Sequence, residues 1–186
     1  MLYASTSAQE QMLSLGHFFN PHKQLVDKLG LSGSSYELVS SIPAITSYLS
    51  DKWVGIKEQE HQLQKTLLDY LNSREDITIH GETSADGSVR VPTISFTVKG
   101  WKSQDLVETV EKGTNFGFRW GEFYSYRLVA DFLGLGRDGI VRVSMVHYNT
   151  GETSRHCSLS KRIDIALVAE VRAFIAALDK VLAEGN

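Results

Sequence analysis

Two arginines interrupt segments that otherwise alternate like β-strands. In residues 140–146 (IVRVSMV) every second side chain from the first valine is apolar, and Arg142 falls on the other face. In residues 116–120 (FGFRW) three aromatic side chains share a face and Arg119 projects from the opposite one. A guanidinium within an apolar strand is costly unless it is paired, and its planar fork suits a carboxylate or a phosphate better than lysine would. The pattern predicts a clamp for such an anion; an internal bridge to a carboxylate, or exposure on a solvent face, is the alternative.

A glycine-rich segment just before the strand of Arg142 has the spacing of a nucleotide-binding motif. Residues 134–139 (GLGRDG) spell G-x-G-x-x-G. That motif binds a pyrophosphate only where a strand precedes it and a helix follows, because the first amides of the helix then point at the phosphates. Here the expected order is the reverse, with a helix before and a strand after. The sequence therefore predicts a helix-ending glycine and a tight turn, and no nucleotide site.

The histidines and the single cysteine form no recognisable metal or nucleophile pattern. No two histidines stand four residues apart on a clear helix, and no cysteine clusters with them, so a structural zinc site is not expected. Cys157 follows His156 directly, but adjacent side chains seldom face each other, so a Cys–His nucleophile is not expected either. His80, at the end of a predicted strand, is interpreted as a surface imidazole with its hydrogen bonds satisfied. One cysteine also excludes an internal disulfide.

The elements that must position the arginines follow from hydrophobic periodicity. Residues 42–71 have a helical pattern, as two helices or one long kinked helix, with Ser41 as the N-cap. The first ~35 residues are expected to be irregular, apart from a short strand at 2–4, and Ser103 is expected to cap a further helix. The remaining expectations are strands at 77–80, 91–98, 115–120 and 140–146, a short helix at 126–133 and a last helix at 165–182. This order predicts an α/β domain with a small sheet packed by helices.

Composition narrows the class of protein. The chain has 186 residues, of which 42% are hydrophobic and 22% charged; this is typical of globular proteins and excludes disordered and fibrous classes. The formal net charge of −3 provides no general attraction to nucleic acid or anionic membranes. No apolar run approaches the ~18 residues of a membrane span, and the first residues lack the features of a signal peptide. We expect a cytoplasmic protein with no nucleic-acid or membrane partner.

Residues 139–150 (GIVRVSMVHYNT) resemble the C-terminal signature of class V aminotransferases, the pyridoxal-phosphate family that includes the cysteine desulfurases. Four more segments resemble the family in the expected order, and together the matches cover most of residues 1–150. They are residues 1–3 (MLY), 35–40 (SYELVS), 90–96 (RVPTISF) and 117–125 (GFRWGEFYS). Five ordered segments are much more specific than any one of them.

The resemblance implies the fold-type-I architecture, of which this chain would be the C-terminal part. Residues 1–40 would be a remnant of the large domain and the crossing loop, and residues 41–186 the small α/β domain with a mainly antiparallel sheet. An amino-acid substrate, pyridoxal 5′-phosphate as cofactor, and a homodimer are implied as well. By position, Arg142 matches the arginine that binds the substrate α-carboxylate, and Arg119 matches a second active-site arginine. Ser40 lies about where a hydroxyl residue reaches the neighbouring subunit's cofactor phosphate.

The sequence also departs from the family it resembles. The family holds its cofactor as a Schiff base on a lysine followed by Gly-Pro, but none of the ten lysines has that context and no Gly-Pro dipeptide occurs. The desulfurase cysteine is missing too, since Phe123 and Tyr124 occupy that region, so persulfide chemistry is not expected. These departures predict a fragment that is inactive alone. The alternatives are a pseudo-enzyme module that pairs with a full-length homologue, and a small anion-binding regulatory domain if Arg119 and Arg142 converge.

Residues 151–168 separate the family signature from the segment that resembles the family's last helix. Loops of more than ~15 residues are uncommon in compact domains. Two interpretations stay open, a surface loop and an intron that has been translated wrongly. A transcript that joins Thr150 to the region of Glu170 would support the intron, and an intact mass that includes Cys157 would exclude it.

Overall fold

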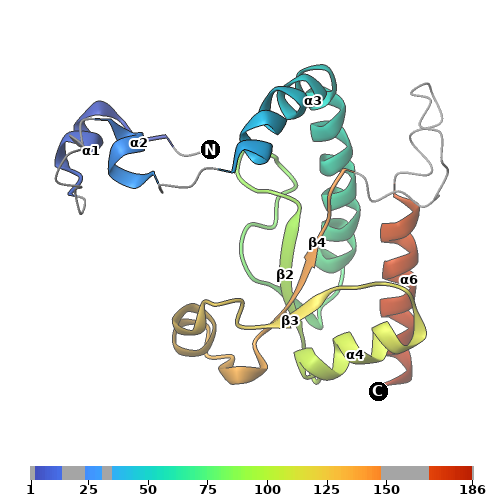
Figure 1. Ribbon diagram of the computed structural model, residues 1–186. Helices are drawn as coiled ribbons and strands as arrows, with labels where there is room; N and C mark the ends of the chain where they lie inside the picture. The colour runs from blue at the N-terminus through green and yellow to red at the C-terminus, as the bar shows by residue number, and fades with distance from the viewer. Residues whose placement is uncertain (1–2, 14–23, 31–34, 148–167, 186) are drawn as a thin grey trace. The chain divides into compact units, whose positions relative to one another are not determined.

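The computed structural model describes residues 3–13, 24–30, 35–147 and 168–185 (Figure 1). The chain forms two compact units, Met1–Asp51 and Lys52–Asn186, which are described separately. The division falls inside one helix, α3 (Tyr36–Asn72), about a dozen residues beyond the boundary that the family resemblance implied. No helix among the described residues is long and apolar enough to cross a membrane.

The first unit contains two short helices, α1 (Thr6–Gln11) and α2 (Leu25–Leu29), before the start of α3. The Ser5 hydroxyl caps α1 by accepting a hydrogen bond from the Ala8 N–H at 3.2 Å. The ammonium of Lys28 then joins the two helices, because it donates to the carbonyl of Gln9 and, at 3.2 Å, to that of Met12. The expectation of an irregular start is therefore wrong for Thr6–Gln11 and Leu25–Leu29, which are helical, and residues 3 and 4 of the expected strand at 2–4 are not in a strand.

The long helical pattern of the sequence is one continuous helix. α3 begins at Tyr36, six residues earlier than predicted, and the hydroxyl of Ser35 accepts a hydrogen bond from the Leu38 N–H at 3.4 Å. Ser41, the predicted N-cap, lies inside the helix and donates its hydroxyl to the Leu38 carbonyl at 2.7 Å. The earlier serine therefore supplies the cap, and Pro43 is accommodated within the helix, where it lacks an N–H to donate.

The second unit is built on a four-stranded antiparallel sheet with the order β1-β2-β4-β3. Its strands are β1 (Ile77–Ile79), β2 (Thr93–Val98), β3 (Arg119–Gly121) and β4 (Ile140–Ser144). Every predicted strand of this unit exists, although each is shorter than its apolar run in the sequence. The α/β class with a small antiparallel sheet is confirmed.

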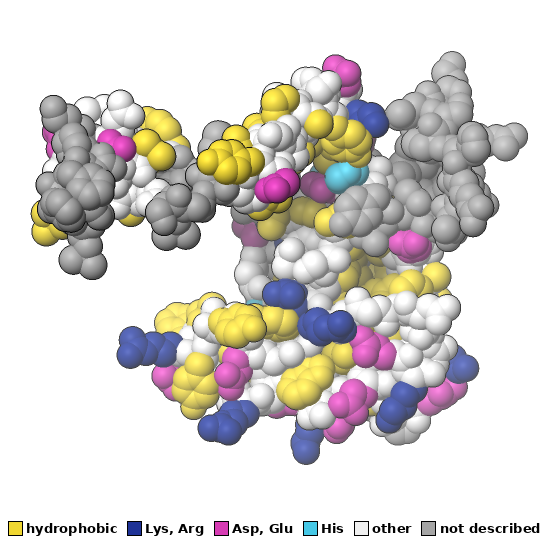
Figure 2. All heavy atoms as spheres, in the orientation of Figure 1, with side chains coloured by type: hydrophobic (Ala, Val, Ile, Leu, Met, Phe, Trp, Pro, Cys, Tyr) yellow, Lys and Arg dark blue, Asp and Glu magenta, His cyan; other side chains and the backbone are white. Residues whose placement is uncertain are grey.

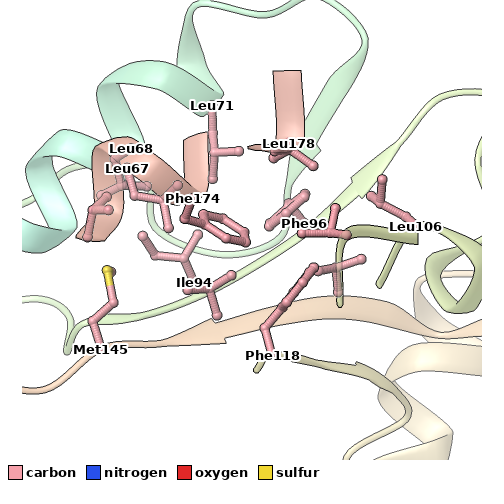
Figure 3. Packing of buried hydrophobic residues seen from close by; sticks show 14 of the residues in the cluster. Leu67, Leu68, Leu71, Ile94, Phe96, Leu106, Phe118, Met145, Phe174 and Leu178 are labelled. Carbon is pink, nitrogen blue, oxygen red and sulfur yellow. The ribbon is translucent and has the colours of Figure 1, made fainter. Parts of the chain in front are cut away.

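Three helices cover one face of this sheet and bury its apolar side chains. They are the C-terminal part of α3, α4 (Ser103–Gly113) and α6 (Ala169–Glu184). Figure 3 shows leucines of α3 and side chains of α6 pointing toward Ile94 and Phe96 of the sheet. Phe174 of α6 meets the ring of Phe118 edge to face, with 5.1 Å between centroids. α3 and α6 run alongside each other (Figure 1), joined by a hydrogen bond of 2.7 Å from the Tyr70 hydroxyl to Asp179.

The start of α4 differs from the prediction that Ser103 is its cap. Ser103 is the first helical residue, and its hydroxyl donates to the Gly139 carbonyl at 3.2 Å. The carboxylate of Asp138 serves as the cap instead, because it accepts the backbone N–H groups of Ser103 at 2.8 Å and Gln104 at 3.5 Å. The helix start is thus attached to the segment that leads into β4.

The G-x-G-x-x-G segment is a turn, as predicted. It follows a short π-helix, η1 (Arg127–Phe132), contains the 3₁₀ turn η2 (Gly136–Asp138), and runs directly into β4. Its three glycines, at 134, 136 and 139, all have positive φ angles, of 71°, 61° and 71°. A helix precedes the glycines and a strand follows, so the segment does not have the strand–loop–helix order of a pyrophosphate site.

Candidate functional site

The face of the sheet away from the core helices carries polar side chains. Arg119 of β3 lies directly opposite Arg142 of β4, and Arg142 lies opposite Ser95 of β2. His80, just after β1, continues the same row, since its backbone N–H donates to the Ser95 carbonyl at 2.8 Å. Residues that face each other across antiparallel strands project from the same side of a sheet. Strand pairing therefore brings two guanidinium groups, a hydroxyl and an imidazole onto one face, called here the polar face.

Arg142 is the most informative member of this row. β4 is an inner strand, between β2 and β3, and Arg142 is half-buried. Its Nε is fully buried without a hydrogen-bond partner. Within the described part of the chain the guanidinium contacts no carboxylate; it lies against the ring of Phe123, with Cζ 4.1 Å from the ring centroid. A buried donor without an acceptor costs about 1–3 kcal/mol, so this site is suited to an incoming anion.

Arg119 occupies a different environment on the edge strand β3. Its side chain is 67% exposed, and Nη1 donates to Oε1 of Glu111 at 3.2 Å and to the Phe118 carbonyl at 2.8 Å. The bridge to a carboxylate, one of the alternatives left open by the sequence, is thus found for Arg119; among the described residues it is not found for Arg142. Like charges opposite each other in a sheet repel, and Glu111 offsets that repulsion.

His80 is less exposed than its position at a strand end suggested. The residue is half-buried, and Nε2 lies 3.0 Å from the Thr97 hydroxyl oxygen on the neighbouring strand. Burial lowers the pKa of His80, because the charged imidazolium loses solvation there. A hydrogen-bonded His80 was expected from the sequence. Its place in line with Arg142 was not expected, because that place follows from the register of β1, β2 and β4.

A strained turn after β3 completes the site, and no sequence signal pointed to it. Phe123 and Tyr124 are non-glycine residues with positive φ angles, of 49° and 61°. Phe123 is half-buried against Arg142, whereas Tyr124 is fully exposed. Figure 2 shows exposed hydrophobic side chains among charged ones on the surface in view. Tyr126, Leu128 and Phe132, which follow this turn in the chain, are exposed as well.

The remaining predicted site residues lie elsewhere. Ser40 is an exposed residue in the early turns of α3, in the first compact unit, and so is separate from the unit that holds both arginines. His156, Cys157 and residues 151–167 lie outside the described residues. No group of three or more histidine, cysteine or acidic side chains that could hold a metal ion occurs among the described residues.

The polar face fits the acid group of an amino acid better than it fits the reactive end of pyridoxal phosphate. The Arg142 guanidinium and the neighbouring Ser95 hydroxyl suit a carboxylate or phosphate oxygen. The described lysines are exposed, apart from the half-buried Lys28 of the first unit, and none belongs to the row of Arg119, Arg142 and Ser95. This face therefore offers no described amine to bond the cofactor's aldehyde.

Comparison with known proteins agrees with these features. The family Aminotransferase class-V matches residues 39–153. Over 156 residues, 82% of this chain and 39% of the relative, the chain is 53% identical to the aminotransferase-like protein FGM3 of Gibberella zeae. It is 36% identical to the cysteine desulfurase-like protein ustD of Aspergillus flavus, over 97% of this chain and 38% of that relative. The chain thus spans about two fifths of the length of these two relatives.

Solved structures show the same fold. A NifS-like protein from Rickettsia africae superposes with a TM-score of 0.58 at 19% identity, over 84% of this chain and 38% of that chain. A cysteine desulfurase from Thermococcus onnurineus superposes with a TM-score of 0.56 at 23% identity, over 75% of this chain and 29% of that chain. The fold-type-I small-domain architecture implied by the sequence is confirmed. Because the family match covers well over half of its residues, the protein belongs to the aminotransferase class-V family.

Proposed function

We propose that this chain provides the substrate-carboxylate site of a pyridoxal-phosphate-dependent enzyme that acts on amino acids. The observation that carries the proposal is Arg142, a half-buried guanidinium on an inner strand with no anionic partner in the described chain. Charge-assisted, bidentate pairing makes arginine the residue suited to a planar carboxylate. Arg119 lies directly across the strand pair, but its charge is paired with that of Glu111, so Arg142 is the anion-binding group of this proposal.

Pyridoxal phosphate, when bound, would supply the electron-withdrawing chemistry that acts on the amino acid. The share of this chain is to bind and orient. Arg142 fixes the acid end of the substrate, and Ser40 is the candidate hydroxyl for a cofactor phosphate in a second subunit. Because no lysine here has the family's Lys-Gly-Pro context, we propose that the 186-residue chain by itself forms no covalent link to pyridoxal phosphate. A stoichiometric, borohydride-reducible adduct at one lysine would contradict this.

The carboxylate site is tested by titrating the chain with L-alanine and with L-alaninamide, in which the acid is replaced by a neutral amide. We expect binding of L-alanine only, measured by calorimetry or by NMR shifts. Hydrogen bonds to a charged group contribute about 1.5–3 kcal/mol, so Arg142→Gln should weaken L-alanine binding about 10- to 100-fold. Arg137→Gln, at an exposed arginine of the nearby turn, is the matched control. Equal binding of acid and amide, or unchanged affinity in Arg142→Gln, would overturn the proposal.

A second candidate function is a non-enzymatic module that pairs with a full-length homologue. It is favoured by large apolar side chains exposed at helical spacing on the first unit's part of α3, namely Leu38, Val39, Ile42 and Ile45. Apolar patches of this kind mark interaction surfaces. We expect the chain to co-purify with a tagged full-length homologue and the double variant Leu38→Asp/Ile45→Asp not to; Lys57→Asp, at an exposed polar position of the same helix, is the control.

A further inference from the structure

The turn that follows β3 has a backbone conformation that side-chain-bearing residues rarely adopt. Phe123 and Tyr124 are consecutive residues with φ angles of 49° and 61°, and the turn is closed by a hydrogen bond of 2.9 Å from the Ser125 N–H to the Glu122 carbonyl. Strain of this kind persists only where the surrounding structure imposes it, and it concentrates at functional sites. Neither residue is glycine, so each carries a side chain in a backbone conformation that glycine would adopt at lower cost.

The two side chains of this turn have opposite environments. The ring of Phe123 is half-buried over the guanidinium of Arg142, with 4.1 Å between Cζ and the ring centroid. This separation lies well inside the range of a cation–π interaction. The ring of Tyr124 is fully exposed. The left-handed turn thus directs one aromatic ring onto Arg142 and the next away from it.

The contact restricts how Arg142 can present its donors. Nε is buried and unpaired, and Cζ lies over the Phe123 ring, 4.1 Å from its centroid. No side chain of the described residues forms a hydrogen bond or ion pair with the terminal nitrogens. An arginine without such a partner loses rotamer freedom when it binds a ligand, which weakens binding. A flat ring that packs against the guanidinium removes much of that freedom in advance.

We propose that Phe123 is a positioning residue for Arg142: its ring, held by the left-handed turn, fixes the plane of the guanidinium so that the terminal N–H groups are ready for a carboxylate. This inference rests on the proposed function, since it concerns the same site. Phe123 lies in the region where, by the family resemblance, desulfurases carry their catalytic cysteine. In this chain we propose that the loop contributes an aromatic ring that positions Arg142 and does not contribute a reactive group.

The test compares Phe123→Leu, Phe123→Tyr and Tyr124→Leu with the wild-type chain. Leucine keeps apolar bulk but lacks the flat ring, tyrosine restores the ring, and Tyr124 has the same backbone conformation without the contact. The first readout is the Nε–H signal of Arg142 in a ¹H–¹⁵N NMR spectrum, assigned by its loss in Arg142→Lys. We expect the ring-current shift of this signal to disappear in Phe123→Leu and to persist in the other two variants.

The second readout is the affinity for L-alanine. We expect Phe123→Leu to bind about 3- to 10-fold more weakly, and Phe123→Tyr and Tyr124→Leu to remain within twofold of wild type. An unchanged Nε–H signal in Phe123→Leu, or an equal loss of affinity in Tyr124→Leu, would overturn the inference. Should Phe123→Leu not fold, Phe123→Met is measured in its place: a lost ring-current shift with weaker L-alanine binding supports the inference, and no change in either opposes it. If wild type binds no L-alanine while the signal still moves, the proposed function fails and the positioning contact stands.

Discussion

Replacing Gly139 with alanine separates two reasons for a glycine at the start of β4. Gly139 has a φ angle of 71°, and a Cβ atom added to it would lie 2.3 Å from both the carbonyl carbon and the oxygen of Gly121. Gly134 has the same φ angle of 71°, but a Cβ added there meets no atom within 4 Å. Gly134→Ala therefore measures the cost of a positive φ angle alone. Gly139→Ala measures a clash against a neighbouring strand together with a larger backbone cost, because the ψ angle of Gly139, −147°, lies outside the left-handed helical region.

The magnitudes differ enough to be resolved. A left-handed backbone costs a side-chain-bearing residue about 1–2 kcal/mol, which is the full effect expected for Gly134→Ala. Crowding a well-packed site adds about 1–3 kcal/mol, and here the obstacle is the backbone of β3, which cannot rotate away. We expect Gly139→Ala to lower the free energy of unfolding by about 3 kcal/mol or more. Gly117→Ala, at a position without a positive φ angle or a close neighbour, should remain within about 0.5 kcal/mol of wild type.

The assay is urea unfolding followed by far-ultraviolet circular dichroism, with the midpoint and slope fitted for each variant. The clash also bears on the site, because Gly121 pairs with Ile140 in the same register that sets Arg119 opposite Arg142. We therefore expect Gly139→Ala, but not Gly134→Ala, to weaken L-alanine binding under conditions where both are folded. Equal destabilisation by the two substitutions would refute the close approach of β3 to this glycine.

Two further predictions concern the cap of α4 and the titration of the polar face. Asp138→Ala should lower the free energy of unfolding by about 1 kcal/mol, because the Ser103 N–H loses its 2.8 Å acceptor; Asp131→Ala, at an exposed residue of η1, should have little effect in the same urea assay. Because burial lowers the pKa of His80 from its usual value of 6.5, its contribution to stability is complete above pH 6.5 and is lost as the pH falls through the folded-state pKa. His80→Gln should accordingly show a shallower fall in unfolding free energy between about pH 7 and pH 5 than wild type, and an equally steep fall would contradict the shift.

Several local features of this protein could be predicted from residue order. The alternation around Arg142 and Arg119 placed both on the face opposite their apolar neighbours, and the structure has them on one face of one sheet. The glycines of residues 134–139 predicted a turn because a helix pattern precedes them and a strand pattern follows. These features depend on periods of two and 3.6 residues, which are properties of a continuous stretch of chain.

Other features required contacts between distant segments. Asp138, rather than Ser103, caps α4, and the two lie on different elements that meet only in the folded sheet. Ser35 starts α3 before the predicted Ser41, since the periodic pattern begins later than the helix itself. His80 joins the row of Ser95 and Arg142 only through the register of β1 and β2.

The sequence by itself determined that Arg119 and Arg142 lie on the polar faces of their strands, and its motifs identified the family. Only the tertiary structure decided that Glu111 pairs with Arg119, while Arg142 has the Phe123 ring and no carboxylate among the residues that the structure describes. The reason is that hydrophobic periodicity specifies which way a side chain points, whereas its partner depends on which turns and helices are brought beside it. The positive φ angles of Phe123 and Tyr124 belong to the second class, because residue type alone disfavours them and the packing of the turn imposes them.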